Sequence, residues 1–193
     1  MYRVALGRVD ALCRETADWL DPQVLAQPLT RQQRAARVLL AKMLDRGVLP
    51  ALQTDRGGKP RFIDDALPGF NLSHSGDQVL ALLSDHGEVG GDVEVIRARP
   101  RWRRIADETF SPSCLRWLRR QSEPLPAFWL LWTAHEAALK QQGGSVWQMS
   151  ALQLVWPDLA PAGAFICCRR AGDIQLALCG AHPFPADLPI ETL

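Results

Sequence analysis

The spacing of apolar residues divides the chain into strands and helices. Apolar and polar positions alternate over residues 2–7, which predicts a strand. A spacing of three and four residues then predicts a helix that begins after Thr30, forms a capping box with Gln33 and ends near Arg46. Its buried face would consist of five apolar residues: Ala36, Leu39, Leu40, Met43 and Leu44.

The middle of the chain predicts strands joined by tight turns. Residues 54–61 are expected to form a loop, because two glycines and a proline interrupt any regular element there. A turn is expected at Ser75-Gly76, and residues 85–87 are expected to close a hairpin into the strand that follows. The strands that they connect would cover residues 70–74, 79–84 and 89–96.

Helical patterns dominate the next part of the chain. Pro100 opens one that runs to about Phe110, and Ser111 caps another with Pro112 at its first position. Further elements are a helix over 128–142 that stops at two glycines, strands at 151–156, 164–169 and 173–180, and an extended surface tail from Pro183. Strands and helices in both halves indicate an α+β fold with antiparallel pairing.

The size and composition fit one globular unit, or two small halves packed as one, since 47% of the 193 residues are hydrophobic. No apolar run approaches the roughly 18 residues that span a bilayer, and the N-terminus lacks the pattern of a signal peptide. The five cysteines form no C-x-x-C pair. We therefore expect free thiols and a cytoplasmic location, with no membrane partner.

The net charge of +1 hides an uneven distribution. Between Arg97 and Arg120 there are eight arginines against Asp107 and Glu108. This excess would attract an acidic partner, although a solvated basic face is the alternative. Balanced total charge and the absence of a recognised binding motif speak against nucleic acid.

Two short acidic motifs carry the candidate chemistry. Asp92 and Glu94 are two residues apart in a predicted strand, so both point to one face while Val93 points to the other. Glu136 and Lys140 are four apart on a predicted helix and share a face. A divalent cation would offset the repulsion between these carboxylates, so the two motifs together suit a magnesium–phosphate site. A solvated strand face and a surface ion pair are the plainer alternatives.

Cationic and polar residues elsewhere offer phosphate ligands. Arg37 and Lys59 provide a planar fork of donors and a compact charge, and His74 can donate from its ring. Ser73 and His74 do not form a hydrolase dyad, since neighbours in a strand face opposite sides. The sequence also lacks a Walker phosphate loop, because Lys59 is followed by Pro60.

Taken in order, these segments resemble the 4'-phosphopantetheinyl transferases of the surfactin-synthetase-activating (Sfp) type. The matching stretches are Gly58-Lys59-Pro60 and residues 70–76, 90–94 and 128–140. Residues 87–97 and 140–145 are most similar to the AcpT branch of holo-acyl-carrier-protein synthases. The match extends over residues 37–144, and four motifs in this order are specific to the family although each alone is weak.

This resemblance implies two similar α/β halves, residues 1–86 and 87–193, related by a pseudo-twofold axis with the active site between them. It implies a monomer that transfers 4'-phosphopantetheine from coenzyme A to a serine of an acidic apo acyl or peptidyl carrier protein. The second product would be adenosine 3',5'-bisphosphate. The reaction would depend on Mg²⁺, with Mn²⁺ as the alternative ion.

The resemblance also assigns roles to residues. Asp92, Glu94 and Glu136 would bind the metal, and Glu136 would take the proton of the serine, directly or through water. Lys140 would steady the phosphate charge, so that Glu136, Lys140 and Asp92 form the catalytic set. The remaining matches would hold the nucleotide end of coenzyme A, together with Lys140: Arg37, Lys59, Pro60, Ser73 and His74.

Two positions depart from the family pattern. His135 stands where a lysine usually precedes the glutamate, so we expect coenzyme A to bind more weakly above the pKa of this histidine. Gly91 replaces a larger residue before Asp92, and we expect it to mark a close backbone approach. The rival functions are another magnesium-dependent phosphotransferase or phosphoesterase, and a non-catalytic module that binds a carrier protein or nucleic acid through the arginine cluster.

Overall fold

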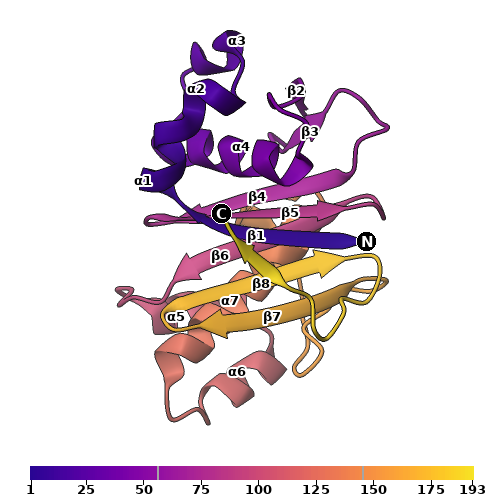
Figure 1. Cartoon of the computed structure of the whole chain (residues 1–193). Helices are drawn as coiled ribbons and strands as arrows, with labels where there is room; N and C mark the ends of the chain where they lie inside the picture. Colours follow the sequence, from indigo (N-terminus) through magenta and orange to yellow (C-terminus); the bar gives the residue numbers. More distant parts are fainter. Residues whose placement is uncertain (56, 145) are drawn as a thin grey trace.

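Two β-sheets lie next to each other in the centre of the molecule, each with a long helix on its outer side (Figure 1). The structure is a computed structural model that describes residues 1–55, 57–144 and 146–193. Arg56, in the expected loop 54–61, and Ser145, at the end of the 140–145 match, lie outside the described residues.

The first sheet has the strand order β4-β5-β1-β9. Antiparallel pairs join β4 to β5 and β5 to β1, whereas β9 from the chain end pairs parallel with β1. The bounds are β1 Tyr2–Arg8, β4 Gly69–Ser75, β5 Gln78–Ser84 and β9 Ile190–Thr192. The predicted strands and the turn at Gly76 are confirmed, but the last residues of the expected surface tail belong to this sheet.

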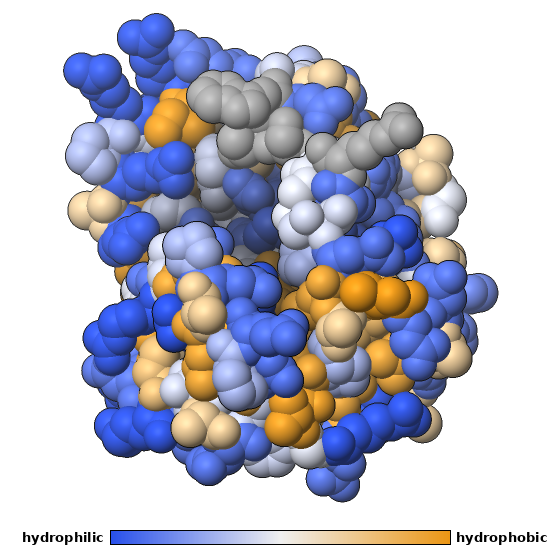
Figure 2. All heavy atoms as spheres, turned by 90° about the horizontal axis from the view of Figure 1, so that it is seen from above, coloured by the Kyte–Doolittle hydropathy of each residue, from blue (hydrophilic) through white to orange (hydrophobic). Residues whose placement is uncertain are grey.

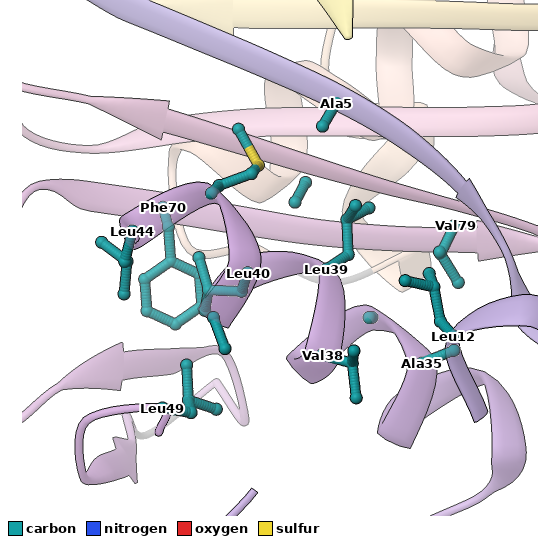
Figure 3. Packing of buried hydrophobic residues seen from close by; sticks show 14 of the residues in the cluster. Ala5, Leu12, Ala35, Val38, Leu39, Leu40, Leu44, Leu49, Phe70 and Val79 are labelled. Atoms are coloured by element: carbon teal, nitrogen blue, oxygen red, sulfur yellow. The ribbon is translucent and has the colours of Figure 1, made fainter. Parts of the chain in front are cut away.

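Helix α4, Arg31–Leu44, covers the first sheet. Thr30 caps it and forms the predicted capping box with Gln33, which satisfies two amides that a helix start leaves unpaired. All five residues of the predicted apolar face are buried. Figure 3 shows side chains of this helix packed against strand residues such as Phe70 and Val79. The apolar stripe therefore fixes which face of α4 meets the sheet.

The second sheet has the order β6-β8-β7 and is antiparallel throughout. Helix α7, Pro124–Gln141, lies against its outer face and is buried on most sides, as its continuous apolar run predicts. Smaller helices α5, Trp102–Thr109, and α6, Pro112–Leu118, complete this layer. The strand bounds are β6 Val89–Val95, β7 Phe165–Ala171 and β8 Ile174–Gly180. The hairpin predicted at residues 85–87 is wrong, because β6 pairs with β8 in this sheet and not with β5 of the first sheet.

Both halves of the chain have the same connectivity. Apart from short helices and a small extra hairpin in the first half, each runs strand, long helix, strand, strand, and the last of these strands lies between the other two. A third apolar cluster joins the facing sheets through residues such as Leu80, Leu82, Val93 and Leu178. The mixed architecture fits the expected α+β class. The pseudo-twofold axis between the halves stays a prediction.

Several local predictions were wrong. Residues 151–156 are not a strand: the Trp156 amide donates to the Ser113 hydroxyl, and the Leu154 amide to the Leu152 carbonyl. Leu154 is instead buried against the α7 layer. The alternating apolar residues of this segment therefore belong to a loop that packs on the core. Part of the expected loop 54–61 forms a hairpin of β2, Leu52–Thr54, and β3, Pro60–Phe62.

Short helical segments between β1 and α4 had no counterpart among the predicted elements, because each has four residues or fewer: α1 Val9–Leu12, η1 Cys13–Glu15, α2 Thr16–Trp19 and α3 Pro22–Leu25. A further 3₁₀ segment, η2, covers Val146–Ala151. Among the described residues, no helix is both long and apolar enough to cross a bilayer.

Candidate active site

The outer face of β6 lies directly against the backbone of α7. A Cβ atom added to Gly90 would overlap the Ala137 carbonyl oxygen and the Gln141 amide nitrogen. Alternation places Asp92 and Glu94 on this same face, while Val93 is buried between the two sheets. The predicted division of faces is confirmed. The close backbone approach, however, is at Gly90 and not at Gly91, whose nearest neighbours are leucine side chains.

Asp92 is the centre of a buried polar cluster. Its Oδ1 accepts hydrogen bonds from the Ser73 hydroxyl and the Lys140 ammonium group, both at 2.7 Å. Lys140 also donates to Ser73 Oγ at 3.1 Å. Burial alone would lower the pKa of Lys140, but attraction to Asp92 and Glu136 outweighs it and raises the pKa, so the side chain is a fixed positive charge. Strands β4 and β6 and helix α7 thus meet at the carboxylate of Asp92.

Glu94 lies beside this cluster with its own hydroxyl partner. The Ser75 hydroxyl donates to Glu94 Oε2 at 2.5 Å. Burial raises the pKa of Glu94, which the hydrogen bond from Ser75 opposes and the charge of Asp92 reinforces. Two carboxylates on one face therefore repel each other, as the sequence predicts.

Glu136 lies one helical turn before Lys140 and is half-buried. Burial raises its pKa to about 7; Lys140 and Arg99 oppose the change, and Asp92 and Glu94 add to it. A carboxyl with a pKa near 7 has the proton affinity that a general base needs at neutral pH. Arg99 lies 4.3 Å from the centre of the Trp132 ring, and this contact holds its charge near the site.

The three carboxylates suit a hard divalent cation in their chemistry. Asp92 Oδ2 is buried and has no hydrogen-bond partner among the described residues, and a cation would satisfy such an oxygen. As the side chains stand, no three His, Cys, Asp or Glu residues within 1–55, 57–144 and 146–193 are grouped closely enough to hold one ion. The Lys140 ammonium group supplies the positive charge at Asp92 in this arrangement.

A pocket of about 200 Å³ opens beside Lys140. Segments from both halves of the chain line it: residues 57–60, Asn71, Leu72, Lys140, Gly143 and Gly144. In the space-filling view from above, one face of the molecule is hollowed and its deeper surface is hydrophilic (Figure 2). Lys59, Pro60 and Lys140 are three of the residues predicted to bind coenzyme A, and all three line this pocket.

The other predicted nucleotide ligands differ in what they contact. Lys59 Nζ donates to Glu88 and to the Val89 carbonyl oxygen, so its charge is already paired. Ser73 is buried and bonded to Asp92. His74 is exposed, and partial desolvation together with the charge of Lys140 lowers its pKa. Arg37 donates to the Gln33 carbonyl of its own helix.

His135 does not face this site, which corrects the expected contact with coenzyme A. The ring is fully buried, its centre lies 4.9 Å from that of Phe110, and its Nδ1 is 2.7 Å from the Leu131 carbonyl oxygen. Burial lowers the pKa of His135 to about 4, which the hydrogen bond only partly opposes. The ring is therefore neutral near neutral pH, and it offers no pH-dependent contact to a phosphate group of coenzyme A.

His135 should instead make stability depend on pH. Its folded pKa of about 4 lies below the ordinary value of 6.5, so the unfolded chain binds more protons between these values. Stability is full above pH 6.5 and should fall by about 2 kcal/mol by pH 5, since each tenfold change in proton affinity is worth about 1.4 kcal/mol. Urea unfolding of the wild type and of His135→Leu at pH 7 and pH 5 checks this. Equal losses in both proteins would contradict the prediction.

The comparison with protein families identifies the superfamily of this chain. A family model described as the 4'-phosphopantetheinyl transferase superfamily (ACPS) matches residues 88–186, a span that holds the carboxylates and Lys140. The chain belongs to this superfamily and is an enzyme of the phosphopantetheinyl transferase class.

Individual relatives narrow the resemblance. The chain is 39% identical to the 4'-phosphopantetheinyl transferase AcpT of Salmonella typhimurium over 95% of its own length and 94% of that protein. It is 36% identical to AcpT of Escherichia coli over 95% and 93% of the two lengths. A putative 4'-phosphopantetheinyl transferase of Synechocystis is 37% identical over 64% of this chain and 52% of that protein. The predicted likeness to the AcpT branch is thus confirmed.

Two contributors to the site have no role among the sequence predictions. Ser75 is expected in a turn and within the family match over residues 70–76, without a role of its own, although polar residues at alternate positions of one strand, Asn71, Ser73 and Ser75, indicate a polar face. No sequence signal separates Arg99 from the neighbouring arginines. What sets it apart is its contact with the ring of Trp132, which lies 33 positions later in the chain.

Proposed function

We propose that this enzyme transfers 4'-phosphopantetheine from coenzyme A to a serine hydroxyl of an apo acyl or peptidyl carrier protein. Adenosine 3',5'-bisphosphate would be released, and Mg²⁺, or Mn²⁺ in its place, would be required. The observation that carries the proposal is the cluster of Asp92, Ser73 and Lys140 at a pocket built from both halves of the chain. Membership of the superfamily supplies the reaction type.

In the proposed mechanism, the residues position and neutralise phosphate groups more than they react with them. Lys140 lies at the pocket and offers a fixed positive charge to a phosphate oxygen. Asp92, Glu94 and Glu136 would hold the cation, which polarises the phosphorus when bound. Arg37, Lys59, Pro60, Ser73 and His74 would hold the nucleotide end of coenzyme A, and Lys59 would exchange its present partner Glu88 for phosphate.

Glu136 is the proposed base for the serine proton. A serine hydroxyl is a weak nucleophile at neutral pH, so a carboxylate within reach, or one water molecule away, assists the attack. The raised pKa favours proton uptake, and a bound cation would lower this pKa. As the proton moves from the serine oxygen to a Glu136 oxygen, the serine oxygen would form a bond to the phosphorus of the phosphopantetheine group. The bond from this phosphorus to the oxygen shared with the nucleotide phosphate would break, and adenosine 3',5'-bisphosphate would leave with that oxygen.

The wider setting follows from the same proposal. We assign residues 1–86 to a half that binds the nucleotide and residues 87–193 to a half that carries the catalytic residues, related by a pseudo-twofold axis with the site between them. All five cysteines are free thiols, which supports the proposal that the enzyme acts in the reducing cytoplasm. We also propose that the enzyme is a monomer.

The arginines between Arg97 and Arg120 are proposed to attract the acidic carrier protein. Two of them are paired on the surface, Arg104 with Glu108 and Arg119 with Asp107. The other six form no ion pair with the described residues and remain for an approaching acidic surface or for solvent. Such charges act mainly on the rate of association and are screened by salt.

Mass spectrometry of an apo carrier protein tests the function. Incubation with coenzyme A, Mg²⁺ and the enzyme should add one phosphopantetheine group to a serine of the carrier, and EDTA should abolish the addition. Excess Mg²⁺ after EDTA should restore it, which controls for damage by the chelator. Equal modification in EDTA would contradict the metal requirement.

The same assay separates the rival functions. Hydrolysis of coenzyme A without a carrier would favour a phosphoesterase. Tight binding of the carrier without any mass gain would favour a non-catalytic module. Either result would overturn the proposed function.

A further inference from the structure

The edge of β6 is joined to β4 by side chains rather than by a backbone ladder. The amides of Gly91, Val93 and Val95 donate to Asn71 Oδ1, Ser73 Oγ and Ser75 Oγ at 2.9, 3.4 and 3.2 Å. The two strands belong to different sheets. We call these three residues of β4 the side-chain ladder. It connects the strand of the carboxylates to the first half of the chain.

The two serines of the ladder do more than satisfy amides. Ser73 accepts from the Val93 amide and donates to Asp92, and Ser75 accepts from the Val95 amide and donates to Glu94. Each hydroxyl therefore fixes a carboxylate and the amide that follows it. Asn71 differs, since its side-chain oxygen accepts from the Gly91 amide and the bond involves no carboxylate.

The position of Ser75 makes its hydroxyl a defined orienting group. Its exposed fraction is only 5%, so water does not readily replace the hydroxyl as a partner of Glu94. Its single proton is directed to Glu94 because the backbone amide occupies an acceptor position. Ser75 thus holds Glu94 through one oxygen, Oε2.

We propose that Ser75 is a positioning residue that orients Glu94 for the divalent cation, an inference that rests on the proposed function. Hydrogen bonds to ligating carboxylates set their orientation, and their loss commonly weakens metal binding 10- to 100-fold. Ser75 thereby couples the first half of the chain to the metal-binding face of the second half. The role of the ladder at Asn71, by contrast, is structural.

Binding of Mn²⁺ to the full chain, measured by electron paramagnetic resonance without coenzyme A or carrier, tests this role. Ser75→Ala should weaken Mn²⁺ binding about tenfold, and Ser75→Thr, which keeps the hydroxyl, should restore it to within about threefold of the wild type. Asn71→Ala is the matched control: it removes a ladder contact of similar burial and should lower thermal stability without weakening Mn²⁺ binding.

A double variant shows whether Ser75 acts through Glu94. Glu94→Gln should weaken Mn²⁺ binding by itself, and Ser75→Ala should add no further loss in that background. Equal losses in both backgrounds, or wild-type affinity in Ser75→Ala, would overturn the inference. If Ser75→Ala does not fold, tenfold weaker binding by Ser75→Thr would overturn it as well.

The outcomes for this inference and for the proposed function are distinguishable. A wild-type enzyme that loads no carrier, with Mn²⁺ binding weakened by Ser75→Ala, would refute the function and keep the positioning role. Carrier loading by the wild type, with unchanged Mn²⁺ binding in Ser75→Ala, would support the function and refute the positioning role. A wild type that binds no Mn²⁺ would refute the metal assignment and the positioning role together.

Discussion

Asp92→Asn is expected to reduce phosphopantetheine transfer about a thousandfold. The carboxylate is the shared partner of Ser73 and Lys140, and its second oxygen is buried and has no hydrogen-bond partner among the described residues. Loss of its charge would weaken the proposed cation site and leave Lys140 without its closest counter-ion. A cation supplies several kcal/mol to such a transition state, and about 4 kcal/mol corresponds to a thousandfold change in rate.

The measurement is the initial rate of carrier modification at saturating Mg²⁺ and coenzyme A. Asp18→Asn is the control, because Asp18 is exposed on α2 and belongs to no part of the site. It should retain the wild-type rate. Thermal unfolding should show that Asp92→Asn is folded at the assay temperature. Transfer by Asp92→Asn within tenfold of the wild type would refute a central role for this carboxylate.

Gly90→Ala is expected to destabilise the protein by about 3 kcal/mol or more. The added methyl group would overlap backbone atoms of Ala137 and Gln141, and backbone cannot move aside by rotating a side chain. Relief requires α7 to shift away from β6, which disrupts the second core and separates Glu136 and Lys140 from Asp92. Activity should therefore fall together with stability.

Urea unfolding measures this effect, with Gly91→Ala as the neighbouring control. A Cβ at Gly91 would lie 3.1 Å from a Leu80 methyl group, and a side chain can yield by a few tenths of an ångström. The expected cost is below about 1.5 kcal/mol. Equal destabilisation by both substitutions would contradict the argument that contact between backbones makes Gly90 necessary.

Much of the candidate site was predictable because its residues follow local periodicities. Asp92 and Glu94 share a strand face, and Glu136 and Lys140 share a helix face, as the periods of two and four residues require. Ser75 was missed because its role depends on Glu94 in another sheet. His135 was misjudged because a position in a motif does not say which side of a helix meets the core.

The sequence by itself determined the elements that depend on neighbouring residues. These include the capped helix α4 with its apolar face, the hairpin of β4 and β5, and the family to which the chain belongs. Only the tertiary structure decided that Gly90 brings β6 against α7, that Ser73 and Ser75 join the carboxylates to the first sheet, and that His135 is buried. The physical reason is that desolvation, ion pairing and close packing depend on which distant segments meet, and local periodicity does not encode those meetings.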